Sequence, residues 1–427
     1  MREDYLLLHP DSLPMKRTSL VFLLALWLAP CTAAGASGSP GLFTLKMGGF
    51  VNAEFFHDTR RMVSAREGLV PLFPAPVKPD ADGHDLNAVP STTFSLMASR
   101  LQVSLTGPSV LGATSSALFE VDFLGTGPDR FNLLRMRHAY LRLDWEGSSL
   151  LAGQYWHPLL ITSCYPGVVA FGGAPPFHVL NRGPQLRYTH HAGPLALMAA
   201  LVSQSDFASP GPSPVGGSSS EFIRNSGRPE VAGQLIYNQG RLLAGVTATS
   251  LCLLPRTVTA SGHQTRERMR SVSGNLFVKY TGQVIIWKVQ GIYGDNMAHM
   301  VMLGGYAEAG PIDPEKQLYS YTGIRTVAAW TDLETNTRPL QAGLFAGYTE
   351  NLGSSVRVTG QSWVRGGDIH ALWRIAPRIG WHAGPAVFQL ECTIDQAAYG
   401  TPDEHLRVRD TASATNIRLL AGIRYSF

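Results

Sequence analysis

The stretch ATNIRLLAGIRYSF, residues 414–427, alternates between two kinds of side chain. One set of alternate positions is mainly apolar or aromatic and the set between them is mainly polar or small. Successive side chains of a β-strand point to opposite faces, so this period of two predicts a strand with one apolar and one polar face. The apolar set is Ile417, Leu419, Ala421, Ile423, Tyr425 and Phe427, and the other includes Asn416, Arg418, Gly422, Arg424 and Ser426.

The same alternation recurs along the rest of the chain, for example at residues 43–55, 117–123 and 340–348. We count about sixteen such segments. Many exceed the five or six residues typical of soluble strands and approach the roughly 9–11 residues with which a tilted strand crosses a bilayer. The predicted strands start near residues 43, 92, 115, 133, 149, 184, 194, 228, 241, 269, 283, 319, 337, 368, 385 and 414. Short turns are expected to alternate with long loops between them.

The composition is that of a folded chain with few charges. Of the 427 residues, 44% are hydrophobic and 15% are charged, whereas roughly 25% are charged in a typical soluble domain. This content excludes a disordered protein. The dispersed net charge of +4 gives no reason to expect a nucleic-acid partner. No apolar run reaches the roughly 18 residues that a membrane-spanning helix needs.

The N-terminal residues have the order of an export signal. Met15-Lys16-Arg17 is basic, residues 20–29 are apolar, and Ala34-Gly35-Ala36 fits a cleavage site. We therefore expect residues 1–36 to be an N-terminal extension with a cleaved signal peptide, and residues 37–427 to form a single domain. A lipoprotein signal at Cys31 is the alternative, but Pro30 stands where a small residue is usual.

Strand length, aromatic residues near strand ends, low charge and the export signal together favour lipid outside and water inside. The predicted fold is all-β: a transmembrane, antiparallel, up-and-down β-barrel of about 16 strands. Ile423, Tyr425 and Phe427 at the C-terminus resemble the assembly signal of bacterial outer-membrane barrels. That resemblance implies the outer membrane as location, with its lipid and the barrel-assembly machinery as partners. A secreted, soluble all-β binding protein is the alternative.

Four further segments, residues 49–60, 134–141, 151–158 and 181–188, resemble the DcaP-like porins of bacterial outer membranes. The resemblance spans most of the chain after the signal. It implies a sixteen-stranded, usually homotrimeric porin whose third loop folds inward as a constriction, and residues 157–183 have the place of that loop. It further implies passive diffusion of small anionic or neutral hydrophilic solutes through a water-filled channel, with a preference for small anions such as dicarboxylates.

A pore selects solutes by the size and charge of its constriction. A guanidinium pairs bidentately with a carboxylate, so inward arginines could attract a passing anion. Alternatively, they pair with inward acids and only solvate the wall. Arg374 and Arg378, four residues apart on one strand, are the main candidates for selectivity. The inward arginines predicted from the alternation are Arg100, Arg142, Arg187, Arg325, Arg374, Arg378, Arg418 and Arg424, and the inward acids are Glu54, Glu120, Asp122, Asp144 and Glu391.

Two further arginines, Arg135 and Arg137, fall on the apolar face if the strand that contains them alternates without interruption. We expect them at the rim of the lipid face, where a charge costs roughly 0–1 kcal/mol.

Signals of catalysis or metal binding are weak. Cys164, Cys252 and Cys392 are too far apart in sequence for a disulfide framework or a zinc site. The Met/His cluster at residues 296–302 offers soft ligands that suit copper, but loop methionines more often cover a neighbouring surface, and we expect no metal and no cofactor. The sequence contains no G-x-S-x-G, H-E-x-x-H or Walker A motif. We expect no enzyme, with an outer-membrane barrel lipase or protease as the alternative.

Overall fold

The computed structural model describes residues 43–125, 130, 132–212 and 217–427. The predicted signal peptide with its cleavage site after Ala36 and the alternative signal at Cys31 lie outside these residues. They and the domain boundary at residue 37 therefore stay predictions. Within the described residues, no helix is long and apolar enough to span a membrane.

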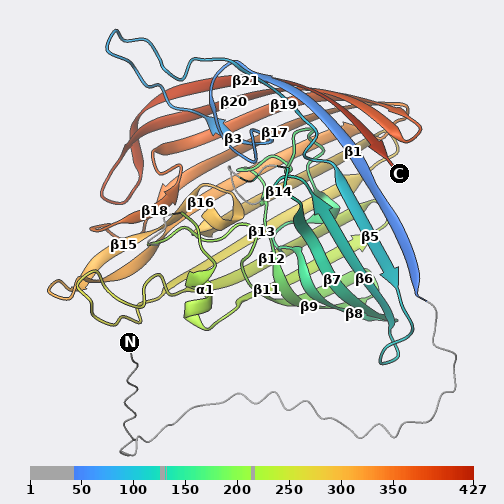
Figure 1. Ribbon diagram of the computed structural model, residues 1–427, viewed down its shortest axis with the longest axis horizontal. Helices are drawn as coiled ribbons and strands as arrows, with labels where there is room; N and C mark the ends of the chain where they lie inside the picture. Colours follow the sequence, from blue (N-terminus) through green and yellow to red (C-terminus); the bar gives the residue numbers. More distant parts are fainter. Residues whose placement is uncertain (1–42, 126–129, 131, 213–216) are drawn as a thin grey trace, which may run out of the picture. The chain divides into compact units, whose positions relative to one another are not determined.

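Sixteen strands form a closed antiparallel barrel, which confirms the predicted fold class (Figure 1). The second position in the wall is shared by two short strands that pair with different halves of β1. The barrel closes where β1 pairs with β21, with Ala53 opposite Ile423. The strands of the wall are β1 (Thr44–Asp58), β4 (Ser91–Ser95) with β5 (Arg100–Thr106), β6 (Thr114–Asp122), β7 (Arg135–Trp145), β8 (Ser148–Trp156), β9 (Arg182–Ala192), β10 (Leu195–Val202), β11 (Glu230–Gln239), β12 (Leu242–Leu253), β13 (Met269–Thr281), β14 (Ile285–Asp295), β16 (Leu318–Thr335), β17 (Leu340–Gly353), β19 (Ile369–Ala383), β20 (Ala386–Pro402) and β21 (Val408–Ser426).

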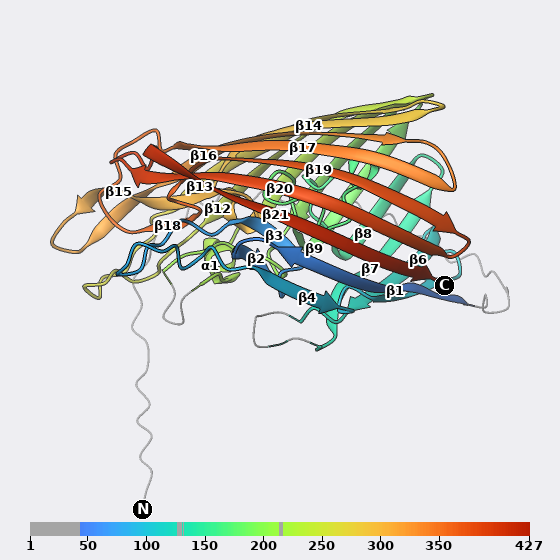
Figure 2. The same cartoon turned by 90° about the horizontal axis from the view of Figure 1, so that it is seen from above.

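The connections are short at one end of the barrel and long at the other (Figure 2). Gly193, Gly240 and Gly384 occupy short turns with φ of 59°, 60° and 60°. This left-handed conformation strains any residue with a Cβ, so glycine allows the chain to reverse within two residues. Most wall strands start close to the predicted positions. The strand predicted near residue 92 is divided into β4 and β5, and β21 begins earlier than predicted, at Val408.

The outer face of the barrel is apolar and exposed. Along β21, Ile423, Tyr425 and Phe427 are 48%, 52% and 62% exposed, whereas Arg418 on the other face is 1% exposed. Exposed aromatic rings also flank the short turns, among them Trp287 and Trp381. A closed barrel with an apolar outer band and an aromatic girdle is suited to lipid rather than water. The soluble alternative does not account for such a surface.

The long connections carry secondary structure that the alternation does not predict. At the long-loop end, β15 extends the sheet by pairing with β16 and β18. Apart from β15, the segments in the long connections are shorter than most of the wall strands. They are β2 (Met62–Ala65), β3 (Val70–Pro74), η1 (Thr162–Cys164), α1 (Glu221–Ser226), η2 (Met297–Met300), β15 (Gly304–Asp313) and β18 (Ser362–Arg365).

Candidate functional site

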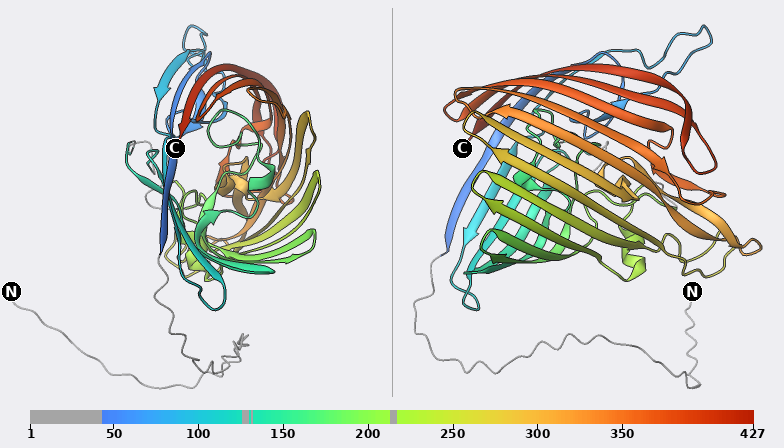
Figure 3. Two further views of the ribbon diagram at one scale, coloured as in Figure 1. Left: turned by 90° about the vertical axis from the view of Figure 1, so that its right-hand side faces the viewer. Right: turned by 180° about the vertical axis from the view of Figure 1, so that it is seen from behind.

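The connection between β8 and β9, residues 157–181, folds into the barrel, as predicted for an inward loop. Figure 3 shows it in the left view as a green segment inside the ring of strands. The amide N–H groups of Gly167 and Val169 donate hydrogen bonds to Asp332 on β16 (2.9 Å) and Glu391 on β20 (2.6 Å). On β13, the amide of Asn275 donates to the carbonyl oxygen of Leu159 (2.8 Å). The loop is therefore fixed to the wall formed by β13–β20.

Apolar packing reinforces this attachment. Phe177 of the loop is fully buried and lies edge-on to Phe345 of β17, with ring centroids 6.2 Å apart. The Met/His cluster packs on the same loop, where Met297 and Met300 of η2 contact Leu159. The methionines thus cover a neighbouring surface, which is the role that the sequence analysis gave as the alternative to metal binding.

Arginines of the wall that holds the loop are buried or partly buried, and they pair with acids. Arg374 is 2% exposed, and its Nε donates to Asp395 (2.6 Å). Arg378 donates to Asp332 (2.7 Å) and also to Glu334 (2.9 Å). These are charge-assisted bonds, which are the strong class of hydrogen bond.

A glycine makes the Arg378 cluster geometrically feasible. Glu334, Gly343 and Arg378 lie in one row across β16, β17 and β19. A Cβ at Gly343 would lie 2.5 Å from the guanidinium carbon of Arg378. The missing side chain lets the guanidinium cross the middle strand and reach the acids beyond it.

Arg418 has the same kind of environment as Arg374. It makes a bidentate pair with Asp58 of β1 (2.9 and 2.7 Å) and stacks over Phe56 at 4.2 Å. The candidates Arg374, Arg378 and Arg418 therefore lie in ion pairs beneath or beside the inward loop. Their role in selectivity stays a prediction. Because each is paired with an acid, these arginines carry little uncompensated charge that could attract an anion.

A cavity of about 410 Å³ lies between the loop and wall residues of β5, β7, β8, β20 and β21. We call it the inner cavity. The wall contributes Arg100, Arg137 and Arg424, and the loop contributes Tyr165 and Phe171 among others. The alternation predicts that Arg100 and Arg424 lie on the inner face, and both line this cavity.

The charges of Arg100 and Arg424 are only weakly compensated. The nearest ion-pair contact of Arg100 is to Glu120 at 4.0 Å. Arg424 takes part in none of the ion pairs found among the described residues, and its Nε donates to the Asn52 side chain at 3.1 Å. Both guanidiniums stack on Phe50, at 5.1 and 4.5 Å from the ring centroid. Stacking holds them in place without removing their charge.

The expectation that Arg135 and Arg137 face lipid is wrong, because both point inward. They are 4% and 0% exposed and pair with Asp122 at 2.7 and 2.9 Å. The cause is a β-bulge: Glu120 pairs with His138 and Val121 with Met136, which leaves Arg137 as the extra residue. Arg137 and His138, although consecutive, then share the inner face. The alternation before the bulge is therefore offset by one residue from the alternation after it.

The remaining residues predicted to face inward do not line the inner cavity; they form ion pairs or hydrogen bonds with the wall or the loop. Arg142 pairs with Asp144 at 2.7 Å near a short turn. Arg187 donates to the Trp156 carbonyl oxygen at 2.7 Å, and Arg325 to that of Gly353 at 3.3 Å. The carboxylates of Glu54, Asp122 and Glu391 are buried, each with hydrogen-bond donors.

Residues that sequence reasoning missed include Arg182, Asp206, Asp332 and Asp395. Asp332 and Asp395 each occupy a position on the polar face of their strand, so the alternation could have identified them as inward acids. Arg182 pairs with Asp206 at 2.6 Å. Asp206 lies in a connection, where no period marks the inward residues, and sequence gives no signal for it.

Solved bacterial outer-membrane proteins share this fold. The outer membrane channel DcaP of Acinetobacter baumannii superposes with a TM-score of 0.66 at 16% identity, over 90% of this chain and 97% of that chain. An anion-selective porin from Comamonas acidovorans gives 0.56 at 10% identity, over 90% and 100%. The trimer form of OmpT of Vibrio cholerae gives 0.53 at 10% identity, over 90% and 99%. No protein-family model and no curated protein sequence matches the chain.

These likenesses confirm the sixteen-stranded porin fold that the sequence resemblance implies. The closed barrel with its apolar outer face is suited to a membrane, and two of these neighbours are described as outer-membrane proteins.

Proposed function

We propose that this chain is an outer-membrane porin, a water-filled channel through which small hydrophilic solutes diffuse passively, with a preference for small anions. The observation that carries the proposal is the inner cavity, which lies between an inward loop and a wall with weakly compensated guanidiniums. A narrow place inside a barrel is where charge decides which solutes pass.

The positions of Arg100 and Arg424 support the anion preference. At physiological salt, charges are screened over roughly 8 Å. Guanidiniums beside a narrow cavity act within this distance on a passing ion, whereas Arg142 in its pair with Asp144 does not add net charge. Because a guanidinium presents several N–H donors in a fixed fork, it suits carboxylate solutes such as dicarboxylates.

The names of the structural neighbours agree with this proposal. One is described as a channel and another as an anion-selective porin. We infer that the chain acts by diffusion rather than by catalysis, so the barrel lipase or protease is the less supported reading.

We further propose that the barrels assemble as a homotrimer and that Phe427 helps the assembly machinery to recognise the chain. A neighbour described in a trimer form supports the first proposal. The exposed outer-face position of Ile423, Tyr425 and Phe427 at the end of β21 supports the second, since it leaves these side chains accessible.

Planar-bilayer recording with the purified, folded protein tests the channel proposal. We expect stepwise conductance increases and, under a KCl gradient, a reversal potential displaced toward that of chloride. Heat-modifiable gel migration provides the control that the barrel is folded. A folded protein that inserts into the bilayer without conducting contradicts the porin function, and a conducting channel that prefers potassium contradicts only the anion preference.

A further inference from the structure

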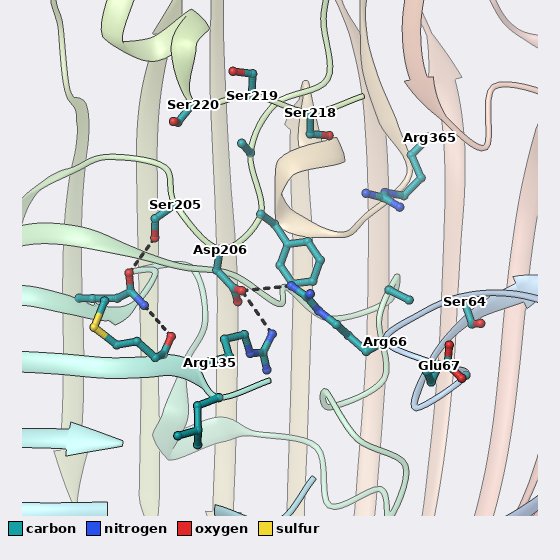
Figure 4. A pocket seen from close by; sticks show the side chains of 17 residues that line it. Ser64, Arg66, Glu67, Arg135, Ser205, Asp206, Ser218, Ser219, Ser220 and Arg365 are labelled. Atoms are coloured by element: carbon teal, nitrogen blue, oxygen red, sulfur yellow. Dashed lines mark hydrogen bonds and ion pairs between the residues drawn. The ribbon is translucent and has the colours of Figure 1, made fainter. Parts of the chain in front are cut away.

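A second and larger cavity, of 930 Å³, lies toward the long-loop end of the barrel from the inner cavity (Figure 4). We call it the outer cavity. Both border β7: Arg135 lines the outer cavity and Arg137, two residues further along the strand, lines the inner one. A solute arriving from the long-loop end would meet the outer cavity first. Its volume falls within the range of small-molecule sites, roughly 300–1,000 Å³.

One acid of the outer cavity is already shared by several guanidiniums. Asp206 accepts from Arg66 and Arg135, each at 3.3 Å, and from Arg182 at 2.6 Å. Figure 4 shows Arg66 and Arg135 converging on this carboxylate. These three guanidiniums neutralise the negative charge of Asp206, so Asp206 repels an incoming anion only weakly.

Arg365 of β18 supplies a guanidinium without such a partner. Among the described residues it takes part in no ion pair, and its Nη2 makes a long hydrogen bond to the Ala298 carbonyl oxygen, at 3.3 Å. Its Nε is buried and has no hydrogen-bond partner in the described part of the chain. Figure 4 shows the side chain extending into the cavity.

Serine hydroxyl groups contribute to the lining of the outer cavity, beside apolar side chains such as Leu134, Met136 and Phe207. Ser218 is exposed and Ser219 and Ser220 are partly exposed along one side of the cavity, whereas Ser64 is exposed at another side (Figure 4). A serine hydroxyl both donates and accepts hydrogen bonds, so such a rim recognises hydroxyl groups of a solute. Glu67 is the other acid that lines the cavity; it is exposed, and in Figure 4 it lies beside Ser64 rather than beside Asp206.

We propose that the outer cavity is a capture site for small hydroxylated carboxylates of the sugar-acid class, with the carboxylate on Arg365 and the hydroxyls on the serine rim. This inference rests on the proposed channel function and adds to it a solute class and a docking step before the inner cavity. Capture of the solute next to the constriction raises its local concentration there and so its flux at low external concentration.

Single-channel recording with gluconate as the probe tests the site. Gluconate added on the long-loop side of the wild-type channel is expected to interrupt the current in a concentration-dependent way, and glucose is expected to do so much more weakly. Because a hydrogen bond to a charged group contributes about 1.5–3 kcal/mol, Arg365→Gln should weaken gluconate binding by about tenfold or more. Arg365→Lys, which keeps the charge without the fork, should weaken it less.

Arg357→Gln is the matched control, because Arg357 is an exposed arginine at the same end of the barrel that pairs with Glu404 and does not line the cavity. It should leave gluconate binding unchanged. Ser218→Asp provides a second test that places an acid in the cavity, and it should weaken gluconate binding while glucose is unaffected.

Unchanged gluconate binding in both Arg365→Gln and Ser218→Asp overturns the capture site, as does an equal loss in Arg357→Gln. A wild-type channel that conducts without any interruption by gluconate also overturns it, yet leaves the porin function standing. A folded wild-type protein that does not conduct contradicts the porin function itself.

Discussion

Arg374 and Arg424 both project from the wall into the barrel, yet their surroundings differ. Arg374 is 2% exposed beneath the inward loop and bonds Asp395 at 2.6 Å. Arg424 borders the inner cavity, stacks on Phe50 and, within the described part of the chain, donates its side-chain hydrogen bond to the neutral Asn52, at 3.1 Å. The inward loop decides which arginines become part of the folded interior and which stay available to solutes. The role of an arginine in the lumen therefore cannot be assigned only from its residue type and its position on the inner face of a strand.

The largest expected effect concerns the stability of the loop-holding wall. Arg374→Leu leaves Asp395 buried without its cation, which typically costs about 3–5 kcal/mol. Arg100→Leu should cost about 1 kcal/mol or less, because its ion-pair contact with Glu120 is long and partly exposed. Urea unfolding in lipid vesicles, followed by heat-modifiable gel migration, measures both.

Arg374→Leu combined with Asp395→Leu sharpens this comparison. Removal of both charges should recover much of the loss, since a buried pair can be replaced by apolar residues at little cost. Equal stability of Arg374→Leu and Arg100→Leu would show that the two walls do not differ in the way described.

An intermediate effect is expected from Asp206 in the outer cavity. Burial raises its pKa, but Arg182, Arg135 and Arg66 outweigh burial and bring the pKa down to about 2. The unfolded value is about 3.9, so the stabilisation is fully present above about pH 4 and is lost as the pH falls through about 2. This stabilisation amounts to about 2–3 kcal/mol. Unfolding midpoints between pH 6 and 2 should decline less steeply in Asp206→Asn than in wild type, and parallel curves would contradict the assignment.

The smallest effect is expected from the loop attachment at Glu391. Its carboxylate accepts hydrogen bonds from the N–H groups of Val169 and Ala170 at 2.6 and 3.3 Å. Glu391→Gln keeps one acceptor and loses the charge, at a cost of about 1 kcal/mol. We expect noisier single-channel current with little change in mean conductance. Glu54→Gln is the control, because the hydrogen bond of Glu54 goes to Asn52 and not to the loop; equal noise in both variants would contradict the attachment.

The sequence predicts the wall well because each strand is long enough for the period of two to be read. The inner position of Arg418 and the outer position of Tyr425 follow directly from it. The alternation cannot predict the bulge at Arg137, which inserts one residue without any change in composition. That single shift reverses the predicted face of both Arg135 and Arg137.

The sequence alone could not predict which inner arginines pair with acids and which border a cavity, and the reason differs from that for the bulge. The pair between Arg378 and Asp332 joins residues 46 apart in sequence and depends on the strand register and on Gly343 between them. The side of the lumen to which the loop docks depends on its contacts with β13–β20. No local pattern encodes these long-range contacts, so the sequence could supply the candidates but not choose between Arg374 and Arg424.

The most direct test of the account is the reversal potential of the double variant Arg100→Gln and Arg424→Gln in a KCl gradient, beside wild type and Arg142→Gln. The account predicts a shift toward potassium in the double variant that is large near 0.1 M salt and small near 1 M, where the screening length falls from about 10 Å to about 3 Å. It predicts a minor shift for Arg142→Gln. Unchanged selectivity of a double variant that still conducts would contradict the claim that the arginines of the inner cavity set the anion preference.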